Sequence, residues 1–158
     1  FEQGHFSIAE HATATLYFTG ISRALTHELC RHRHLSYSQL SQRFVDEGDA
    51  NIVMPPALAG KENGLVEHMD EALGFYEWLV KERMGAGVPR KQAREAARAV
   101  LPNMTETRIV VTGNLRAWHE VIERRTQPDA DAEIQEVMRM AKSELAKVSP
   151  VLFGDDHE

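Results

Sequence analysis

Short strand-like segments are scattered between longer helix-like segments in this chain, and this irregular order narrows the possible folds. Residues 13–19 and 108–112 are rich in β-branched or aromatic side chains, which favours strands. Apolar side chains recur with helical spacing in four further stretches, which are residues 65–84, 90–101, 114–125 and 131–148. A loop is expected over residues 57–64 and a turn at Gly113. We therefore expect an α+β fold rather than a regular series of βαβ units.

The first strand leads directly into a helix-like pattern. Gly20 is expected to end the strand, after which Ile21, Leu25 and Leu29 recur every four residues as one helical stripe. The opposite face of this helix would carry the cationic side chains Arg23, His27, Arg31 and His34. We therefore expect the helix to anchor one face in the core and to present cations on the other.

The segment that follows is unusually rich in hydrogen-bond donors. Residues 31–43 are Arg-His-Arg-His-Leu-Ser-Tyr-Ser-Gln-Leu-Ser-Gln-Arg, without a lysine or an acidic side chain. Forked guanidinium groups suit planar or phosphorylated anions. From Ser36 the chain is expected to be extended, with alternate side chains on one side, namely Tyr37, Gln39, Ser41 and Arg43. This segment, the donor strip, predicts a site for a multiply anionic ligand.

The chain as a whole is acidic, although the donor strip is basic. Its 158 residues, a length typical of one domain, carry a net charge of -6 at pH 7, which argues against a general nucleic-acid binder. Between Arg23 and Arg43 the balance reverses, with four arginines against the single acid Glu28. A basic pocket on an acidic protein suits a small anionic substrate better than a polymer.

Composition also bears on the cellular compartment of the protein. Cys30 is the single cysteine, so no intrachain disulfide is possible, which favours a reducing, cytoplasmic setting. No apolar run approaches the ~20 residues that a membrane span needs. The chain begins at Phe1 without Met, so we expect it to be part of a longer protein.

Arg125 is the most informative residue outside the donor strip. With Leu115, Trp118 and Ile122 it occupies one face of a predicted helix. An arginine on an apolar stripe must either extend its head to water or meet an anion. Its neighbour Arg124 would point the other way and be solvated.

Other polar residues allow a structural and a functional interpretation. Arg94 and Arg98 at the edge of an alanine-rich stripe are expected to be surface residues. Asn114 suits the N-cap of a helix. Arg116 lies near the same helix N-terminus, where backbone N–H groups also favour anions.

Histidine, cysteine and serine chemistry is less well supported. The metal candidates are His5, His11, His27, His32 and His34, but the interleaved arginines would repel a cation, and we expect no metal. His27-Glu28 lacks the second histidine at the spacing of a zinc-protease signature. Cys30 is expected to be a buried, inert thiol, and Ser41 has no evident triad partners. The chain resembles a binder of anions whose difficult chemistry comes from a cofactor.

One spaced motif resembles a known family. Arg31-His32-Arg33, seven residues, Ser41, one residue and Arg43 resemble the signature of the flavin-dependent thymidylate synthases, the ThyX family. Further matches in order are His5-Phe6-Ser7, Glu10-His11, residues 96–102, residues 105–108 and Asn114-Leu115-Arg116. The resemblance extends from Gly4 to about Glu133. The family usually has residues before Phe1 and after Glu158, so parts of the domain are expected to be missing.

The resemblance implies a fold and an activity. The fold would be the single-domain thymidylate synthase-complementing fold, spanning residues 1–158, with an antiparallel or mixed sheet flanked by helices. Members are homotetramers whose active sites combine several subunits. They convert dUMP to dTMP for de novo synthesis, with methylenetetrahydrofolate as carbon donor and NADPH as reductant through bound FAD. No covalent cysteine takes part, and no nucleic acid or membrane is a partner.

The resemblance also implies roles for particular residues. FAD would be contacted by Ser7, Arg31, His32, Arg33 and Gln39, and from another subunit by Asn114, Leu115 and Arg116. Glu120 stands where a flavin-contacting His or Asn is expected, six residues after Asn114. The nucleotide would be held by Glu28, Arg31, Gln39, Leu40, Ser41, Gln42 and Arg43, with Arg98 from a neighbouring chain. Arg125 would be catalytic, lying against the uracil and stabilising its form ionised at N3.

Two other interpretations stay open at this point. The donor strip could belong to a noncatalytic nucleotide- or RNA-binding module, which would bind with a steep dependence on salt. The histidines could instead build a metal hydrolase, which a chelator would inactivate.

Overall fold

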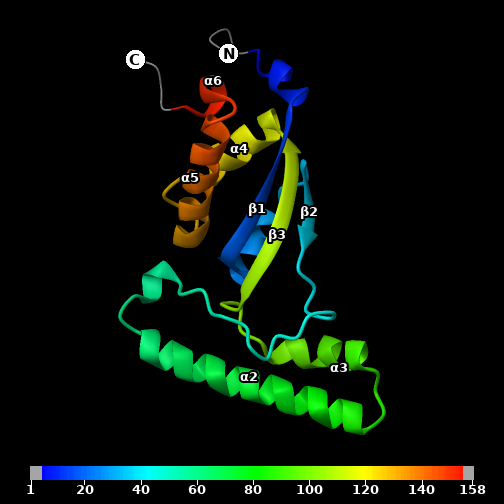
Figure 1. Ribbon diagram of the computed structural model, residues 1–158. Helices are drawn as coiled ribbons and strands as arrows, with labels where there is room; N and C mark the ends of the chain where they lie inside the picture. The colour runs from blue at the N-terminus through cyan, green and yellow to red at the C-terminus, as the bar shows by residue number, and fades with distance from the viewer. Residues whose placement is uncertain (1–4, 155–158) are drawn as a thin grey trace. The chain divides into compact units, whose positions relative to one another are not determined.

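The computed structural model describes residues 5–154, in which helices and strands alternate irregularly (Figure 1). Its strands are β1 (Thr13–Ser22), β2 (Leu35–Gln39) and β3 (Glu106–Asn114). Its α-helices are α1 (Arg23–Leu29), α2 (Glu62–Gly85), α3 (Arg90–Ala97), α4 (Leu115–Arg125), α5 (Ala132–Ala146) and α6 (Pro150–Phe153). The short 3-10 helices are η1 (Phe6–Glu10), η2 (Pro56–Leu58) and η3 (Arg98–Val100). The predicted α+β class is confirmed.

The strands form one three-stranded sheet in which β3 lies between β1 and β2 (Figure 1). The hydroxyl groups of Thr15 and Thr112 are 2.8 Å apart. At the other end of β1, the N–H of Arg23 donates to the carbonyl of Thr105 at 3.1 Å. Residue numbers therefore rise in one strand as they fall in the other, and β1 and β3 are antiparallel.

The chain divides into two compact units. Of the described residues, unit 1 contains residues 5–18, 25–38 and 109–154. Unit 2 contains residues 19–24 and 39–108. The expectation of one domain stays a prediction.

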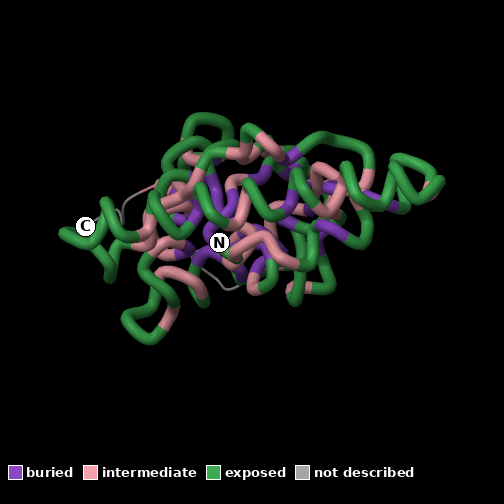
Figure 2. Tube along the Cα trace, turned by 90° about the horizontal axis from the view of Figure 1, so that it is seen from below, coloured by how far each residue is buried: buried purple, intermediate pink, exposed green. Residues whose placement is uncertain are grey.

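Unit 1 is built around α4 and α5, each of which buries most of its predicted apolar stripe. Short buried stretches alternate with exposed ones along the chain (Figure 2). Trp118 and Ile122 are buried on α4, and the Trp118 indole N–H donates to the carbonyl of Ala14 at 3.1 Å. The buried stripe of α5 consists of Ile134, Met138, Ala141 and Leu145. Complete burial of such a side chain contributes ~1.5–3 kcal/mol, so this stripe fixes the helix. Asn114, the last residue of β3, is also the N-cap of α4, so the strand passes directly into the helix.

Unit 2 contains the long helix α2, which packs against α3. Met69 and Tyr76 are buried on α2, and the small residues Ala93 and Ala97 are buried on α3. Small side chains let two helix axes approach closely, as the sequence suggested. The loop expected over residues 57–64 is shorter than predicted, because η2 and the first turn of α2 occupy most of it.

The predicted end of the first strand at Gly20 is wrong. Gly20 has a φ of 67°, a left-handed value that glycine adopts readily, and the strand continues through it to Ser22. Ile21 is therefore a strand residue, and α1 ends at Leu29. The predicted helical face with Arg31 and His34 does not form, because both residues follow the helix in a turn.

The predicted turn at Gly113 is also wrong, since β3 continues to Asn114. A Cβ atom on Gly113 would lie 2.2 Å from Cδ2 of Leu35 on β2. Glycine is needed here because the neighbouring strand brings a side chain onto its backbone.

None of the helices in residues 5–154 is both long and apolar enough to cross a membrane.

Candidate functional site

The turn after α1 presents the first part of the donor strip, and Tyr37 holds this turn in place. The Tyr37 hydroxyl lies 2.7 Å from the carbonyl oxygen of Leu29 and 2.8 Å from that of His32. Its single proton is shared between these two acceptors. Burial raises the pKa of Tyr37, so the hydroxyl stays protonated and able to donate. One strand residue thereby ties down the end of α1 and the turn with Arg31 and Arg33.

Arg125 meets an anion, the second of the two alternatives for an arginine on an apolar stripe. Its side chain is 16% exposed, and its Nη1 lies 2.6 Å from the Glu28 carboxylate. Its Nη2 donates to the backbone carbonyl of Glu28 at 3.3 Å. Its Nε donates to Nε2 of His32 at 2.8 Å. The partners come from α1 and its turn, so two segments far apart in sequence share this cluster.

The hydrogen bond from Arg125 fixes the state of His32. A guanidinium nitrogen has no lone pair to offer, so Nε2 of His32 must be the acceptor and carry no proton. Burial, followed by the charges of Arg125, Arg124 and Arg31, lowers the pKa of His32. The imidazole is therefore neutral at pH 7 and its Nδ1 carries the proton.

A cavity of about 460 Å³ opens beside this cluster. It is lined by Arg31, His32, Arg33, His34, Ala117, Glu120, Val121 and Arg124. Among the described residues, the guanidinium groups of Arg31 and Arg33 have no hydrogen-bond or ion-pair partner. Unpaired guanidinium groups at a cavity wall are suited to bind an anion.

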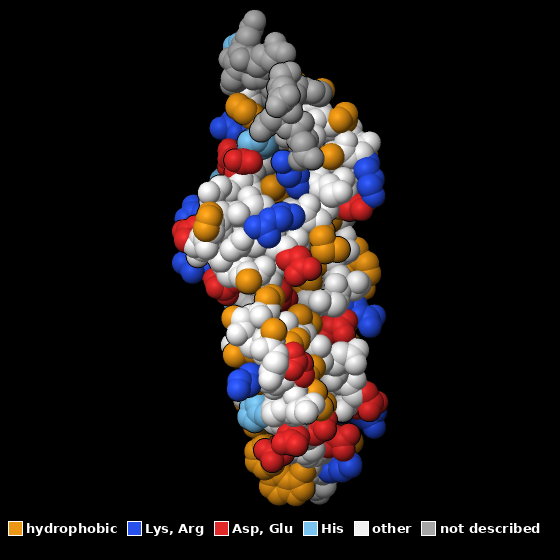
Figure 3. Space-filling model, turned by 90° about the vertical axis from the view of Figure 1, so that its left-hand side faces the viewer, with side chains coloured by type: hydrophobic (Ala, Val, Ile, Leu, Met, Phe, Trp, Pro, Cys, Tyr) orange, Lys and Arg blue, Asp and Glu red, His pale blue; other side chains and the backbone are white. Residues whose placement is uncertain are grey.

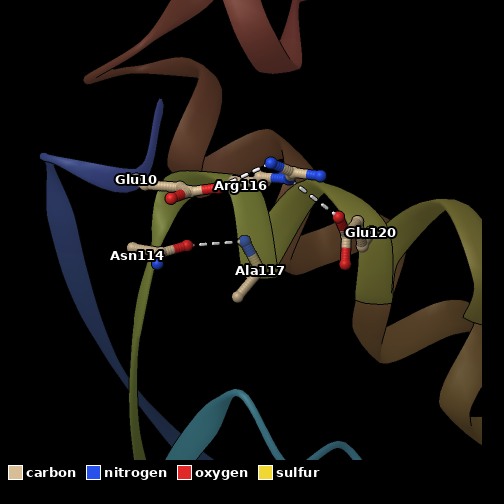
Figure 4. Close-up of polar contacts among 5 residues, drawn as sticks. All are labelled: Glu10, Asn114, Arg116, Ala117 and Glu120. Carbon is tan, nitrogen blue, oxygen red and sulfur yellow. Dashed lines mark hydrogen bonds and ion pairs between the residues drawn. The ribbon is translucent and has the colours of Figure 1, made fainter. Parts of the chain in front are cut away.

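A second cavity of about 350 Å³ shares three of these lining residues, His34, Ala117 and Glu120. Its other lining residues are Glu10, Asn114 and Arg116. Arg116 donates to Glu10 at 2.5 Å and to Glu120 at 3.0 Å, so its charge is already matched by two carboxylates (Figure 4). The two hydrogen bonds raise the pKa of Arg116, which stays protonated.

Asn114 acts as the N-cap of α4, as the sequence suggested. Its Oδ1 accepts from the N–H of Ala117 at 2.8 Å, which satisfies one of the free donors of the first helical turn (Figure 4). The cap uses only the carbonyl side of the amide. The NH₂ group of Asn114 keeps its donors at the edge of the second cavity.

Unit 2 carries the second part of the donor strip. The Gln39 amide donates to the hydroxyl of Thr107 at 3.4 Å, and the Leu40 N–H donates to the carbonyl of Arg108 at 2.9 Å. The prediction of an extended segment through Ser41 and Arg43 is wrong, because β2 ends at Gln39. Ser41 instead starts a turn, in which its carbonyl accepts from the N–H groups of Phe44 and Val45. Gln42 is only 5% exposed, and its Nε2 has no partner among the described residues.

Charged residues of the same unit vary in their degree of burial. Arg43 lies 3.8 Å from Glu95, and both side chains are largely in water, so the pair contributes little. Arg98 is exposed at the start of η3. Arg94, which the sequence placed at the surface, is instead tied to Asp46 at 2.5 Å. Nothing in the local pattern distinguishes Arg94 from Arg98, because its partners are distant in sequence.

Two further residues, Ser7 and Leu115, complete the predicted site. Ser7 is exposed on η1, and Leu115 is half-buried in the first turn of α4. Cys30 is exposed rather than buried, because α1 ends before it. Among residues 5–154 no cluster of three or more His, Cys, Asp or Glu side chains is arranged to hold a metal ion.

Comparison with known proteins places this chain in a family. A flavin-dependent thymidylate synthase of Mycobacteroides abscessus is 53% identical over 98% of this chain and 66% of its own length. Proteins with the same name from Mycobacterium tuberculosis and Mycobacterium avium are 51% and 49% identical, each over 96% of this chain and 65% of the relative. The chain thus spans about two thirds of the length of these relatives. Because residues 1–151 match the profile described as thymidylate synthase complementing protein, the chain belongs to that family.

Proposed function

We propose that this chain is part of a flavin-dependent thymidylate synthase, which methylates dUMP reductively to dTMP. Methylenetetrahydrofolate would donate the carbon unit and NADPH the electrons, through FAD. The observation that carries the proposal is the pair of unpaired guanidinium groups, Arg31 and Arg33, at a cavity of about 460 Å³ in a chain 53% identical to an enzyme of that name. An intact enzyme would be a cytoplasmic homotetramer without nucleic-acid or membrane partners.

The donor set of unit 1 fits a flavin dinucleotide. The pyrophosphate of FAD is anionic, and Arg31 and Arg33 offer forked donors that no carboxylate of the described chain occupies. The free NH₂ of Asn114 is a further donor. The residues proposed to bind FAD are Ser7, Arg31, His32, Arg33, Gln39, Asn114, Leu115, Arg116 and Glu120. Asn114, Leu115 and Arg116 would serve a site shared with another subunit.

The turn in unit 2 suits a nucleotide phosphate. Gln42 holds a buried amide donor without a partner, and such a group normally needs one. A bound nucleotide would supply the missing acceptor. The residues proposed to hold dUMP are Glu28, Arg31, Gln39, Leu40, Ser41, Gln42 and Arg43, with Arg98 from a neighbouring subunit.

Arg125 is the proposed catalytic residue. Three of its five N–H groups are engaged by Glu28 and His32, so two remain for a ligand. Its charge is held in place before any ligand arrives, and such preorganised charge stabilises negative charge that develops on a pyrimidine ring. Bound FAD would supply the hydride chemistry, while the residues of this chain orient the nucleotide and balance its charge.

The decisive experiment measures dTMP formation by the purified protein with dUMP, methylenetetrahydrofolate, NADPH and FAD. We expect dTMP only when all four are present. The variant Arg31→Gln should lose flavin. The control Arg139→Gln on α5 should behave like the parent, because the hydrogen bond of Arg139 in the described part of the chain is to Gln135, outside the proposed site. Absence of dTMP from a folded protein saturated with FAD would contradict the proposal.

The RNA-binding alternative has less support. Acidic and basic side chains are interspersed on the face shown in Figure 3, and the net charge is -6. An RNA-binding module would bind an oligonucleotide with an affinity that falls steeply with salt, without any flavin absorbance.

A further inference from the structure

Arg94 on α3 reaches back to the turn that follows β2. Its Nη1 donates to the backbone carbonyl of Phe44 at 2.9 Å. Its Nη2 donates to Oδ2 of Asp46 at 2.5 Å. The two terminal nitrogens of the guanidinium group thus bind two points of one turn.

The turn gripped in this way is continuous with the predicted nucleotide residues. The carbonyl of Ser41 accepts from the N–H groups of Phe44 and Val45, both at 3.1 Å. The other carboxylate oxygen of Asp46 accepts from the N–H of Gly48 at 3.3 Å. The hydrogen bonds within the turn thus form two sets, residues 41–45 and residues 46–48, and Arg94 bonds to a member of each set.

Burial distinguishes Arg94 from an ordinary surface arginine. Its side chain is 13% exposed, and its Nε is buried without a partner among the described residues. A charge with an unsatisfied donor is kept at such a position only when its remaining contacts compensate. By contrast, Arg43 and Glu95 are 3.8 Å apart, and both side chains are exposed. Arg94 is thus the cation of α3 whose geometry the fold specifies most closely.

The ring of Phe44 gives a second, weaker link between the turn and α3. The Lys91 ammonium lies 4.9 Å from the ring centroid and the Arg43 guanidinium lies 5.7 Å from it. Both distances are within the range of cation–π attraction. The ring itself is 62% exposed, so this contact orients the turn without burying it. Among these contacts of the turn with α3, Arg94 contributes the least exposed side chain.

We propose that Arg94 is a positioning residue of the nucleotide site, which holds residues 41–48 so that Ser41, Gln42 and Arg43 face the anionic ligand in a fixed arrangement. This inference rests on the proposed function. Arg94 would not touch the nucleotide. It would lower the entropy that the turn loses on binding, because the turn is already ordered in the free protein.

The test compares Arg94→Gln and Arg94→Lys with Arg90→Gln, a control on the same helix. Arg90 is exposed, and its side chain has no partner in the described residues. Amide hydrogen exchange of a peptide covering residues 41–48 reports the turn directly and needs no ligand. We expect this peptide to exchange roughly tenfold faster in both Arg94 variants, since a hydrogen bond to a charged group is lost. Arg94→Lys is included because it keeps the charge if Arg94→Gln fails to fold.

Affinity for dUMP, measured by isothermal titration with flavin bound, is the second readout. We expect the dissociation constant to rise roughly tenfold in both Arg94 variants, with flavin occupancy unchanged and Arg90→Gln like the parent. Unchanged exchange and unchanged affinity in the Arg94 variants would overturn the positioning role. Failure of the parent itself to bind dUMP would instead overturn the proposed function, and the exchange rates would still decide whether Arg94 orders the turn.

Discussion

At the scale of single residues, Arg125 is accommodated on an otherwise apolar face of α4 because its N–H groups have acceptors. The Glu28 carboxylate, the Glu28 carbonyl and Nε2 of His32 each take one of its N–H groups. The sequence restricted Arg125 to two environments, water or an anion. It could not identify Glu28 as the partner, because the pair is 97 residues apart in the chain.

Replacement of Arg125 tests its proposed catalytic role. Arg125→Ala should retain FAD but lose most turnover of dUMP, since the charge that balances the ionised uracil is gone. Removing one member of a partly buried pair also leaves Glu28 uncompensated, so the thermal midpoint should fall. Flavin absorbance and dTMP formation measure the two effects separately. Turnover like that of the parent would exclude this role.

His32 gives the protein a predictable response to acid. Because its pKa in the folded state lies below 6.5, its contribution to stability is complete above pH 6.5 and declines as the pH falls below that value. Protonation would place two cations against each other in the hydrogen bond with Arg125. Thermal midpoints recorded between pH 8 and pH 5 should fall more steeply for the parent than for His32→Gln. Parallel curves would show that His32 is not titrating in this cluster.

At the scale of elements, the helices were easier to predict than the turns. The helical spacing of apolar residues predicts both α4 and α5. Each helix begins and ends within two residues of the predicted position. Local sequence favours an end of β1 at Gly20, but the strand continues through this glycine to Ser22. The turn after α1 was missed because Tyr37, which holds it, comes from the next strand.

Tyr37→Phe tests the hydrogen bonds by which the Tyr37 hydroxyl tethers the turn after α1, because it removes the hydroxyl and keeps the ring. We expect a loss of about 1 kcal/mol in the free energy of unfolding and weaker FAD binding, since the turn with Arg31 and Arg33 becomes less ordered. Denaturant unfolding and flavin titration measure these quantities. Tyr17→Phe is a suitable control, as Tyr17 is exposed on β1. Equal FAD affinity in Tyr37→Phe and the parent would contradict a role for the tether in binding.

At the scale of the whole molecule, one buried acid opposes folding at neutral pH. Burial raises the pKa of Glu47, an effect that nearby Arg23 reduces and Asp46 reinforces. A carboxyl whose pKa is raised stabilises the fold below 4.5, and this contribution is lost as the pH rises through the folded value. Glu47→Gln should therefore gain stability relative to the parent between pH 4 and pH 7 in thermal melts. A constant difference across this range would refute the assignment.

The donor strip shows which parts of the site could be predicted from the sequence alone. Its composition predicted an anion site, and the fold does bring Arg31, His32 and Arg33 to one cavity wall. The pairing of Arg116 with Glu10 and the burial of Arg94 depend on tertiary contacts and were not predictable from local spacing. The pair of Arg116 with Glu120, by contrast, is a local i,i+4 pair of α4.

The most direct test of the account is a visible absorption titration of the purified protein, first with FAD and then with dUMP. If the guanidinium groups around the cavity hold a flavin next to a nucleotide, flavin bands should accompany the protein and shift saturably with dUMP. The shift should be lost in Arg31→Gln. A colourless protein that gives no spectral response to either ligand would contradict the account.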